Sequence, residues 1–240
     1  MKALGLTEDR TGLLLQIAYN YINQNDYCGS IPYLREYVDK VPSDTSNLFN
    51  LATVYNHCDE IDSAVVIYQR MLAESPNNVD ALTGIGKYFN QMALSVMDSV
   101  RHYQQTQDTT VAKKWQDLRD NHFDSARVYF SKAFAVAPDD KSVAEEYGVI
   151  CYITGDYAAA IPAFKKLTEL EPANPDNWTS LGDCYLKTQQ FNESARAYEH
   201  VVEIQPDNIP VWESLEALYR ELKEPENQKK AQAKIKQSKG

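Results

Sequence analysis

The 240-residue sequence groups few acids, bases and nucleophiles in a way that could form a catalytic site. The histidines His57, His102, His122 and His200 are scattered, and no acid or nucleophile recurs beside them at a helical spacing. The segment GIGK at 84–87 lies inside a helical pattern instead of following a strand, so it is not a phosphate-binding loop. The sequence predicts no catalytic residue, no cofactor and a protein that is not an enzyme.

The cysteines also lack the spacing of a metal site. Cys28, Cys58, Cys151 and Cys184 are separated by 30, 93 and 33 residues, without a CxxC motif or a recurring spacing to histidine. We interpret all four as unpaired thiols that pack as small apolar core residues, because a disulfide framework is unusual in a long chain with few cysteines. No metal site is predicted.

Composition restricts the class of protein. The chain is 43% hydrophobic and 24% charged, which suffices for a sizeable core in one or two domains. Its net charge of −10 argues against the usual basic type of nucleic-acid binding. Its mean hydropathy of −0.51 argues against a membrane-spanning protein. We therefore expect neither a nucleic-acid partner nor membrane insertion.

The first residues do not form a secretory signal. Glu8, Asp9 and Arg10 interrupt the short apolar start before a signal-peptide core could form. A cytoplasmic location is favoured, and a periplasmic or secreted location stays open if a native signal segment has been removed.

The prolines mark an internal repeat. Pro42 and Pro76 are 34 residues apart, and the same interval separates Pro138 from Pro172 and Pro172 from Pro206. The remaining interval, from Pro76 to Pro138, is 62 residues, which equals 34 plus 28. One repeat therefore contains a 28-residue insertion.

Each repeat contains two amphipathic helices whose apolar residues are three and four apart. The clearest repeat has its apolar and small residues at Trp178, Leu181, Gly182, Tyr185, Phe191, Ser194 and Tyr198. Small residues stand where two helices approach closely, and a large aromatic residue fills the space beside them. These small and large partners are Gly86, Gly148 and Gly182 with Phe130, Phe164 and Tyr198. Polar segments at 23–26 and 154–156 predict the hairpin turns.

This pattern resembles the tetratricopeptide repeat (TPR) family over nearly the whole chain. The resemblance implies an all-α fold, a right-handed superhelical solenoid of helix pairs that bury their apolar faces against one another. We divide the chain into an N-terminal lead-in (1–10), five repeats (11–208) and a degenerate sixth repeat with a polar C-terminal capping helix (209–240). The third repeat (79–140) carries the insertion near 92–119, predicted to lengthen both its helices equally into a protruding antiparallel hairpin.

The protruding hairpin near 92–119, called the arm below, and the two ends of the chain each allow more than one interpretation. Tyr103 and Trp115 either seal the seam of the arm or offer a contact surface. The three leucines at 13–15 cannot all face one neighbour, so residues 1–6, a preceding segment or a second copy of the chain would cover them. Residues 223–240 contain six lysines and two glutamates, which suit a solvated cap or an acidic partner or membrane surface.

Proteins of this family bind peptides or helices of other proteins on the inner surface, which the first helix of each repeat lines. Carried over by position, the resemblance predicts a groove of Tyr19, Asn23, Phe49, Asn50, Thr53, Asn56, Lys87, Asn90, Glu145, Val149, Tyr152, Thr179, Asp183 and Leu186. Asparagine can bind a peptide backbone through both its donor and its acceptor.

One subgroup of the family binds the carboxylate tails of chaperones through lysine, arginine and asparagine. In this chain, the positions equivalent to the lysines of that subgroup are occupied by Leu15 and Asp80, and the position equivalent to its arginine is occupied by Gly84. Only Asn50 matches one of its asparagines. The acidic chain instead favours a neutral or basic partner segment. The sequence thus predicts a non-catalytic protein–protein interaction scaffold. The alternative is a self-associating structural subunit, a homo-oligomer formed through the N-terminal end or the arm.

Overall fold

The computed structural model describes residues 2–105 and 109–237, and the side chains from residue 10 onward within them. Over these residues the regular secondary structure is helical throughout and contains no strand, so the all-α prediction is confirmed. The described residues form α1 (Lys2–Asn23), α2 (Tyr27–Lys40), α3 (Thr45–His57), α4 (Ile61–Glu74), α5 (Val79–Ser95), α6 (Met97–Gln105), α7 (Thr109–Val136), α8 (Lys141–Ile153), α9 (Tyr157–Leu170), α10 (Pro175–Lys187), α11 (Phe191–Ile204), α12 (Ile209–Glu221) and α13 (Pro225–Gln237).

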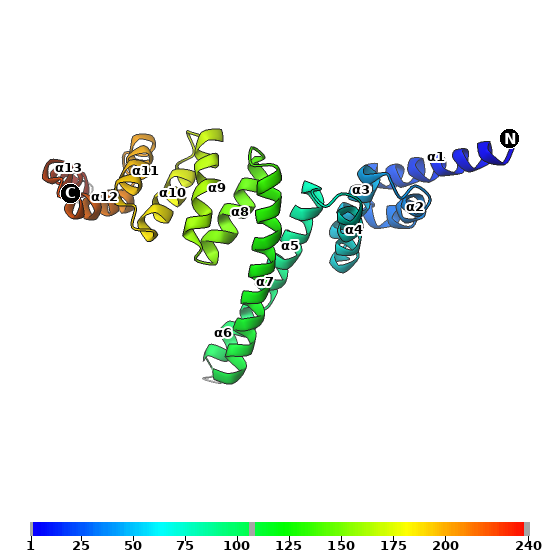
Figure 1. Ribbon diagram of the computed structural model, residues 1–240, viewed down its shortest axis with the longest axis horizontal. Helices are drawn as coiled ribbons and strands as arrows, with labels where there is room; N and C mark the ends of the chain where they lie inside the picture. The colour runs from blue at the N-terminus through cyan, green and yellow to red at the C-terminus, as the bar shows by residue number, and fades with distance from the viewer. Residues whose placement is uncertain (1, 106–108, 238–240) are drawn as a thin grey trace. The chain divides into compact units, whose positions relative to one another are not determined.

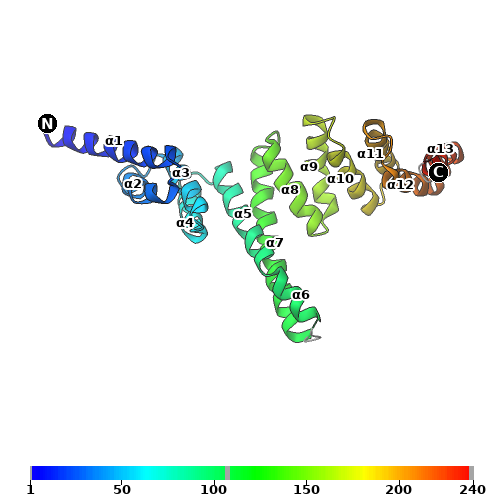
Figure 2. The same ribbon diagram turned by 180° about the vertical axis from the view of Figure 1, so that it is seen from behind.

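The chain divides into two compact units, Met1–Ala133 and Phe134–Gly240. In the first unit, α1 and α2 form one helix–turn–helix pair and α3 and α4 the next (Figure 1). In the second unit, α8 with α9, α10 with α11 and α12 with α13 form three successive pairs, and the view from behind shows the same order (Figure 2). Each pair packs on the pair that follows it within its unit.

The turns inside the pairs share one backbone conformation. The residue before the second helix's N-cap has a positive φ in five turns, at Asn25, Asp59, Gly155, Gln189 and Lys223. Asn25 and Asp59 are 34 residues apart, and the same interval separates the last three in succession. Residues other than glycine rarely adopt this left-handed conformation. The 34-residue period of the sequence therefore recurs in the backbone.

The recurring prolines lie at the second position of the loops that lead from one pair to the next. Trp178 Nε1 donates a hydrogen bond to the carbonyl oxygen of Pro172 at 2.9 Å, and Trp212 repeats this bond to Pro206 at 2.8 Å. A side chain at the N-cap then accepts a bond from the first turn of the following helix, as Asn208 does from Val211 N. This capping satisfies backbone donors that the helix leaves open.

The predicted pairing of small and large residues is confirmed. A Cβ atom added to Gly182 would lie 2.7 Å from the ring of Tyr198, and one added to Gly86 would lie 2.6 Å from the ring of Phe130. These glycines are the places where a ring from the second helix reaches the backbone of the first helix.

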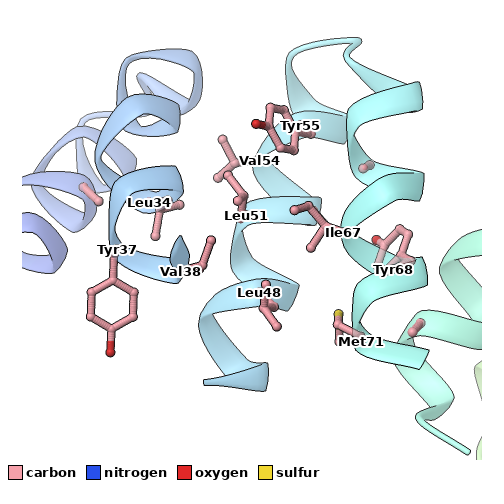
Figure 3. Close-up of a cluster of buried hydrophobic side chains, with 14 of the residues drawn as sticks. Leu34, Tyr37, Val38, Leu48, Leu51, Val54, Tyr55, Ile67, Tyr68 and Met71 are labelled. Carbon is pink, nitrogen blue, oxygen red and sulfur yellow. The ribbon is translucent and has the colours of Figure 1, made fainter. Parts of the chain in front are cut away.

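The core of the first unit is formed by side chains from successive helices. Leu34 of α2, Leu48 and Leu51 of α3 and Met71 of α4 are almost completely buried, and Figure 3 shows them along the interfaces between these helices. Apolar burial of this kind contributes about 25 cal/mol per Å². One pair alone could not bury these faces, so each pair depends on its neighbour.

The first helix of the third pair is interrupted, contrary to the expected continuous extension. Helix α5 ends at Ser95, Val96 caps it, and α6 begins at Met97. The hydroxyl of Ser95 donates to the carbonyl oxygen of Met92 at 2.8 Å, a side-chain bond that competes with the helical ladder. The second helix of the pair, α7, runs through 28 residues without interruption.

The break expected at 107–110 is placed differently. Thr109 and Thr110 already belong to α7, while residues 107 and 108 lie outside the described residues. Helix α6 lies beside the first half of α7 in both views (Figures 1 and 2). Tyr103 and Trp115 on these helices are both half-buried.

At the N-terminal end, α1 begins at Lys2 and continues to Asn23, so residue 10 marks no break in the helix. The three consecutive leucines point to different sides of the helix, so their exposure differs. Leu14 is 6% exposed, Leu13 is 52% exposed, and Leu15 is half-buried. Among the helices described, none is long and apolar enough to span a membrane.

The interpretation of all four cysteines as unpaired core thiols is wrong for two of them. Cys28 and Cys58 form a disulfide with a Cα–Cα distance of 5.7 Å, and Cys28 is exposed. The sequence conceals this pair because stacking brings together turns of adjacent repeats that are 30 residues apart. Cys151 and Cys184 are buried and form no disulfide, as expected.

Candidate functional site

The residues predicted to line a groove belong to both units, and each unit presents its own surface. In the first unit they lie on the first helices of the pairs, α1, α3 and α5, and are Tyr19, Asn23, Phe49, Asn50, Thr53, Asn56, Lys87 and Asn90. In the second unit they lie on α8 and α10 and are Glu145, Val149, Tyr152, Thr179, Asp183 and Leu186.

In the first unit the structure brings Tyr19 and Asn50 together. The Asn50 Nδ2 group donates to the Tyr19 hydroxyl at 2.8 Å, and that hydroxyl donates to Asn47 Oδ1 at 2.8 Å. Asn47 is 8% exposed. These bonds tie α1 to α3 and occupy the amide donor that was expected to bind a peptide backbone.

Asn47, which was not predicted from the sequence, connects this pair to a deeper polar network. Asn47 Nδ2 and the Tyr37 hydroxyl both donate to Asp44 Oδ2, at 2.9 and 2.8 Å. The bond from Asn47 lowers the pKa of Asp44. Burial, followed by the bond to Asp44, raises the pKa of Tyr37. The network therefore holds the start of α3 in place, and its only sequence signal was a polar residue three places after an N-cap.

Asn56 and Lys87 line the same pocket, of about 240 Å³, together with Tyr68 and Tyr88. Asn56 Nδ2 donates to the Tyr68 hydroxyl at 3.2 Å, and burial raises the pKa of Tyr68. The Tyr88 hydroxyl donates to Asp62 Oδ1 at 3.1 Å. The pocket lies among α3, α4 and α5 and is lined by apolar side chains such as Ile61 and Val65 as well as by polar ones.

The other predicted residues of the first unit are dispersed. Asn23 is exposed at the end of α1, and Phe49 packs against the core. Thr53 bonds to the carbonyl oxygen of Phe49 in its own helix at 2.9 Å. The Oδ1 atom of Asn90 is buried and accepts no hydrogen bond from the described residues.

In the second unit the structure brings Tyr152 and Asp183 together. The Tyr152 hydroxyl donates to Asp183 Oδ2 at 3.0 Å, and the Tyr198 hydroxyl donates to Asp183 Oδ1. Asp183 thus joins α10 to both α8 and α11. Burial, followed by the bond to Asp183, raises the pKa of Tyr152 to about 12. The same causes raise the pKa of Tyr198, a residue that sequence analysis assigned to packing alone.

Exposed apolar residues lie on the same helix as Tyr152. Val149 is 47% exposed and Ile153 is 53% exposed, and because they are four residues apart they share one side of α8. Ile153 was missed, although its spacing to Val149 could have indicated it. Leu186 on α10 is half-buried, and Thr179 donates to the carbonyl oxygen of Pro175 at 2.9 Å.

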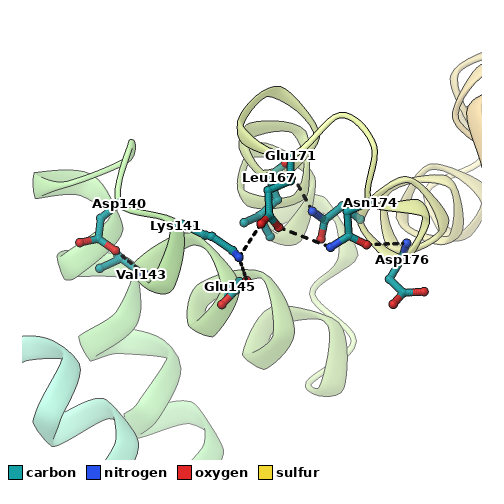
Figure 4. A network of polar contacts seen from close by, with 9 residues as sticks. Asp140, Lys141, Val143, Glu145, Leu167, Glu171, Asn174 and Asp176 are labelled. Carbon is teal, nitrogen blue, oxygen red and sulfur yellow. Dashed lines mark hydrogen bonds and ion pairs between the residues drawn. The ribbon is translucent and has the colours of Figure 1, made fainter.

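Glu145 precedes Val149 by one turn on α8 and lies beside Lys141 (Figure 4). Lys141 Nζ is 3.6 Å from Glu145 Oε1 and 2.5 Å from Glu171 Oε1. The bond to Glu171 raises the pKa of Lys141 and lowers the pKa of Glu171. Lys141 therefore offsets part of the negative charge at this end of α8.

These surfaces offer phenols, amides and carboxylates beside exposed aliphatic side chains, a combination suited to recognition of a polypeptide. Within the described residues, no three or more His, Cys, Asp or Glu side chains are grouped so that they could hold a metal ion.

Two family models of the tetratricopeptide repeat match the sequence, over residues 117–177 and 152–219. This part of the chain consists of tetratricopeptide repeats. It is 32% identical over 57 residues to TPR repeat-containing protein MJ0263 of Methanocaldococcus jannaschii, a match that covers 24% of this chain and 18% of that relative. The chain therefore spans less than a fifth of the curated relative that it matches.

Solved structures of tetratricopeptide-repeat proteins share the fold of this chain at low sequence identity. MamA matches with a TM-score of 0.57 at 14% identity, over 83% of this chain and 93% of its own. YrrB, described as a TPR protein with an unusual peptide-binding site, matches with a TM-score of 0.59 at 14% identity, over 84% and 90%. A tetratricopeptide repeat protein of Parabacteroides merdae matches with a TM-score of 0.55 at 15% identity, over 95% and 78%.

Proposed function

We propose that the protein is a non-catalytic protein–protein interaction scaffold, and that the surface of α8 and α10 binds an extended or helical segment of a partner protein. The single observation that carries the proposal is the juxtaposition on α8. Two aliphatic side chains about half exposed, Val149 and Ile153, flank Tyr152, whose hydroxyl bonds to Asp183 on the neighbouring first helix. Apolar anchors beside fixed polar groups are typical of segment recognition.

The predicted groove residues of the second unit are better suited to bind a partner segment than those of the first unit. In the first unit, Asn50 and Asn56 already donate within the protein. In the second unit, Val149 and Ile153 have no such role and leave apolar area in contact with water. The fold shared with YrrB, which has a peptide-binding site, supports the same assignment.

Charge favours a neutral or basic partner segment. The chain has a net charge of −10. Glu145 lies one turn before Val149 on α8, and Asp183 accepts a bond from Tyr152. A lysine or arginine beside an aliphatic residue in the partner would match this arrangement.

The experiment is a selection of peptides from a random library on the purified chain, followed by calorimetric titration of the best peptide. We expect the selected peptides to combine aliphatic residues with lysine or arginine. The substitution Val149→Lys should weaken the best peptide about tenfold or more, because it removes an apolar contact and places a like charge before a basic peptide.

The matched control is Val66→Lys on α4, where the valine is 62% exposed on a second helix of a pair. This control should bind the peptide as the unsubstituted chain does. Equal binding by the Val149→Lys variant, or no enriched class of peptides, would count against the proposed surface.

Self-association is the second candidate, because the first unit leaves other apolar side chains exposed. Leu13 is 52% exposed at the N-terminal end, and Leu94 and Leu118 of the arm are 50% and 39% exposed. Light scattering over a concentration series tests this candidate. We expect an oligomer that Leu13→Glu or Leu94→Glu weakens, and a monomer at every concentration would exclude it.

A further inference from the structure

We propose that Cys28 and Cys58 are oxidised after folding into a permanent cross-link between the first two helix pairs, and that the protein works in an oxidising compartment. The proposal is independent of the proposed binding surface, which lies in the other unit.

The two cysteines stand at the turn ends of neighbouring pairs. Cys28 is the second residue of α2, and Cys58 is the C-cap of α3. Their Cα atoms are 5.7 Å apart, inside the range of about 4.4–6.8 Å that a disulfide requires. The bond therefore joins helices of two different repeats without displacing either backbone.

Non-covalent contacts hold the same two segments together. The ring of Tyr27 stacks on the ring of His57 with 4.4 Å between centroids, so the residue before each cysteine contacts its counterpart. Asp26 caps α2 by accepting a bond from Gly29 N at 2.9 Å, which sets the direction in which α2 starts. Folding by itself therefore brings the two sulfur atoms within bonding reach.

Accessibility explains why this pair would react and the other cysteines would not. Cys28 is exposed and Cys58 is half-buried, so an external reagent can reach one sulfur of the pair. Cys151 and Cys184 are buried, and burial raises the pKa of Cys184 to about 12. A buried thiol with a high pKa provides almost no thiolate for attack.

The chemistry is thiol–disulfide exchange with a disulfide-bearing oxidant, either a protein or a small molecule. The Cys28 thiolate attacks one oxidant sulfur, forms a mixed disulfide and releases the other oxidant sulfur as a thiolate. The Cys58 thiolate then attacks the Cys28 sulfur of the mixed disulfide and releases the bound oxidant sulfur as a second thiolate. The two cysteines lose two electrons and two protons, and the oxidant disulfide gains them as two thiols.

A disulfide of this accessibility is typical of proteins outside the reducing cytosol. Of the two locations that the sequence leaves open, the cross-link favours the periplasmic or secreted one.

Differential alkylation in cells that naturally produce the protein tests this proposal. The cells are quenched in acid, and free thiols are alkylated in denaturant with a first reagent. Disulfides are then reduced, and the new thiols receive a second reagent before peptide mass spectrometry. We expect the second label on Cys28 and Cys58 and the first label on Cys151 and Cys184. The first label on Cys28 and Cys58 would overturn the proposed compartment.

A second measurement separates pairing from compartment. The reduced, folded chain is incubated with oxidised glutathione, and we expect the Cys28–Cys58 bond to form without a Cys151–Cys184 bond. In the control variant Cys28→Ser, Cys58 should form no intramolecular disulfide. Mixed glutathione adducts on Cys28 in place of the internal disulfide would overturn the claim that folding aligns the two sulfur atoms.

Discussion

Asp183 accepts hydrogen bonds from two tyrosines that belong to different helices, Tyr152 of α8 and Tyr198 of α11. Both phenols must stay protonated to donate these bonds. Ionising either phenol would place a second negative charge beside the carboxylate in a partly dehydrated site. This one carboxylate therefore couples the packing of three helices to the protonation of two side chains.

The stability of the second unit should fall at high pH. The pKa of Tyr152 is about 12 in the folded protein against a reference value of 10.0. Between these two values the folded state binds more protons than the unfolded state. The contribution of Tyr152 is therefore complete below about pH 10 and is lost as the pH rises to about 12. Urea unfolding over this range should show a falling free energy of unfolding.

The control for this pH dependence is Tyr152→Phe, which keeps the ring and removes the titrating hydroxyl. The variant should lose less stability over the same pH range than the unsubstituted chain. An identical slope in the two proteins would contradict the assignment to Tyr152.

Gly182 tests the close approach of a ring to a helix backbone. The substitution Gly182→Ala would place a Cβ atom 2.7 Å from the Tyr198 ring, and we expect a loss of about 1–3 kcal/mol in the free energy of unfolding. Gly12→Ala is the matched control, because nothing lies within 4 Å of its added Cβ atom in α1. There we expect a gain of about 0.5–1 kcal/mol from helix propensity. Equal effects at both sites, measured by urea unfolding, would argue against the packing explanation.

Among the helices, the second members of the pairs differ in their N-caps. Asp26 and Asp156 accept a backbone bond from the first turn, at 2.9 and 3.2 Å. Gln190, at the equivalent place before α11, makes no such bond. The longer side chain of glutamine is a poor substitute for aspartate at an N-cap, so the first-turn N–H groups of α11 receive no bond from the N-cap side chain.

Replacing Gln190 by aspartate should therefore stabilise the second unit. We expect Gln190→Asp to raise the free energy of unfolding by about 0.5–1 kcal/mol, as measured by thermal or urea unfolding. Asp156→Ala, the reciprocal control, should lower it by about 1 kcal/mol. A neutral or destabilising Gln190→Asp substitution would show that the cap of α11 is satisfied in another way.

For the whole molecule, charge is the property that acts at a distance. A net charge of −10 attracts basic segments before contact and is screened by salt over about 10 Å at 0.1 M. The apolar contacts of Val149 and Ile153 act only after contact and depend little on salt. Association and dissociation should therefore respond differently to ionic strength.

Stopped-flow binding of the selected peptide measures this difference. Between about 0.02 and about 0.5 M salt, we expect the association rate constant to fall roughly tenfold, while the dissociation rate constant changes little. An association rate that does not depend on salt would mean that the acidic charge plays no part in choosing the partner.

Much of this protein could be derived without coordinates because its signals are local or periodic. The 34-residue interval between prolines, the three-and-four spacing of apolar residues and the pairing of Gly182 with Tyr198 all describe one helix pair repeated along the chain. A repeated pair must bury the same faces each time, so the pattern determines the fold class. Tyr19, Asn50, Tyr152 and Asp183 were named from the sequence only as separate groove residues, and their contacts in two pairs were not predicted.

Contacts between neighbouring pairs were decided only by the tertiary structure. The Cys28–Cys58 bond, the contact of the buried Asn47 with Tyr19 and the donation of Tyr152 to Asp183 depend on how one pair is rotated and shifted against the next. Local propensity acts over about one helical turn, whereas that rotation is set by the sum of many side-chain contacts. The sequence by itself therefore determined which helices pair, and the packing between pairs determined which side chains meet.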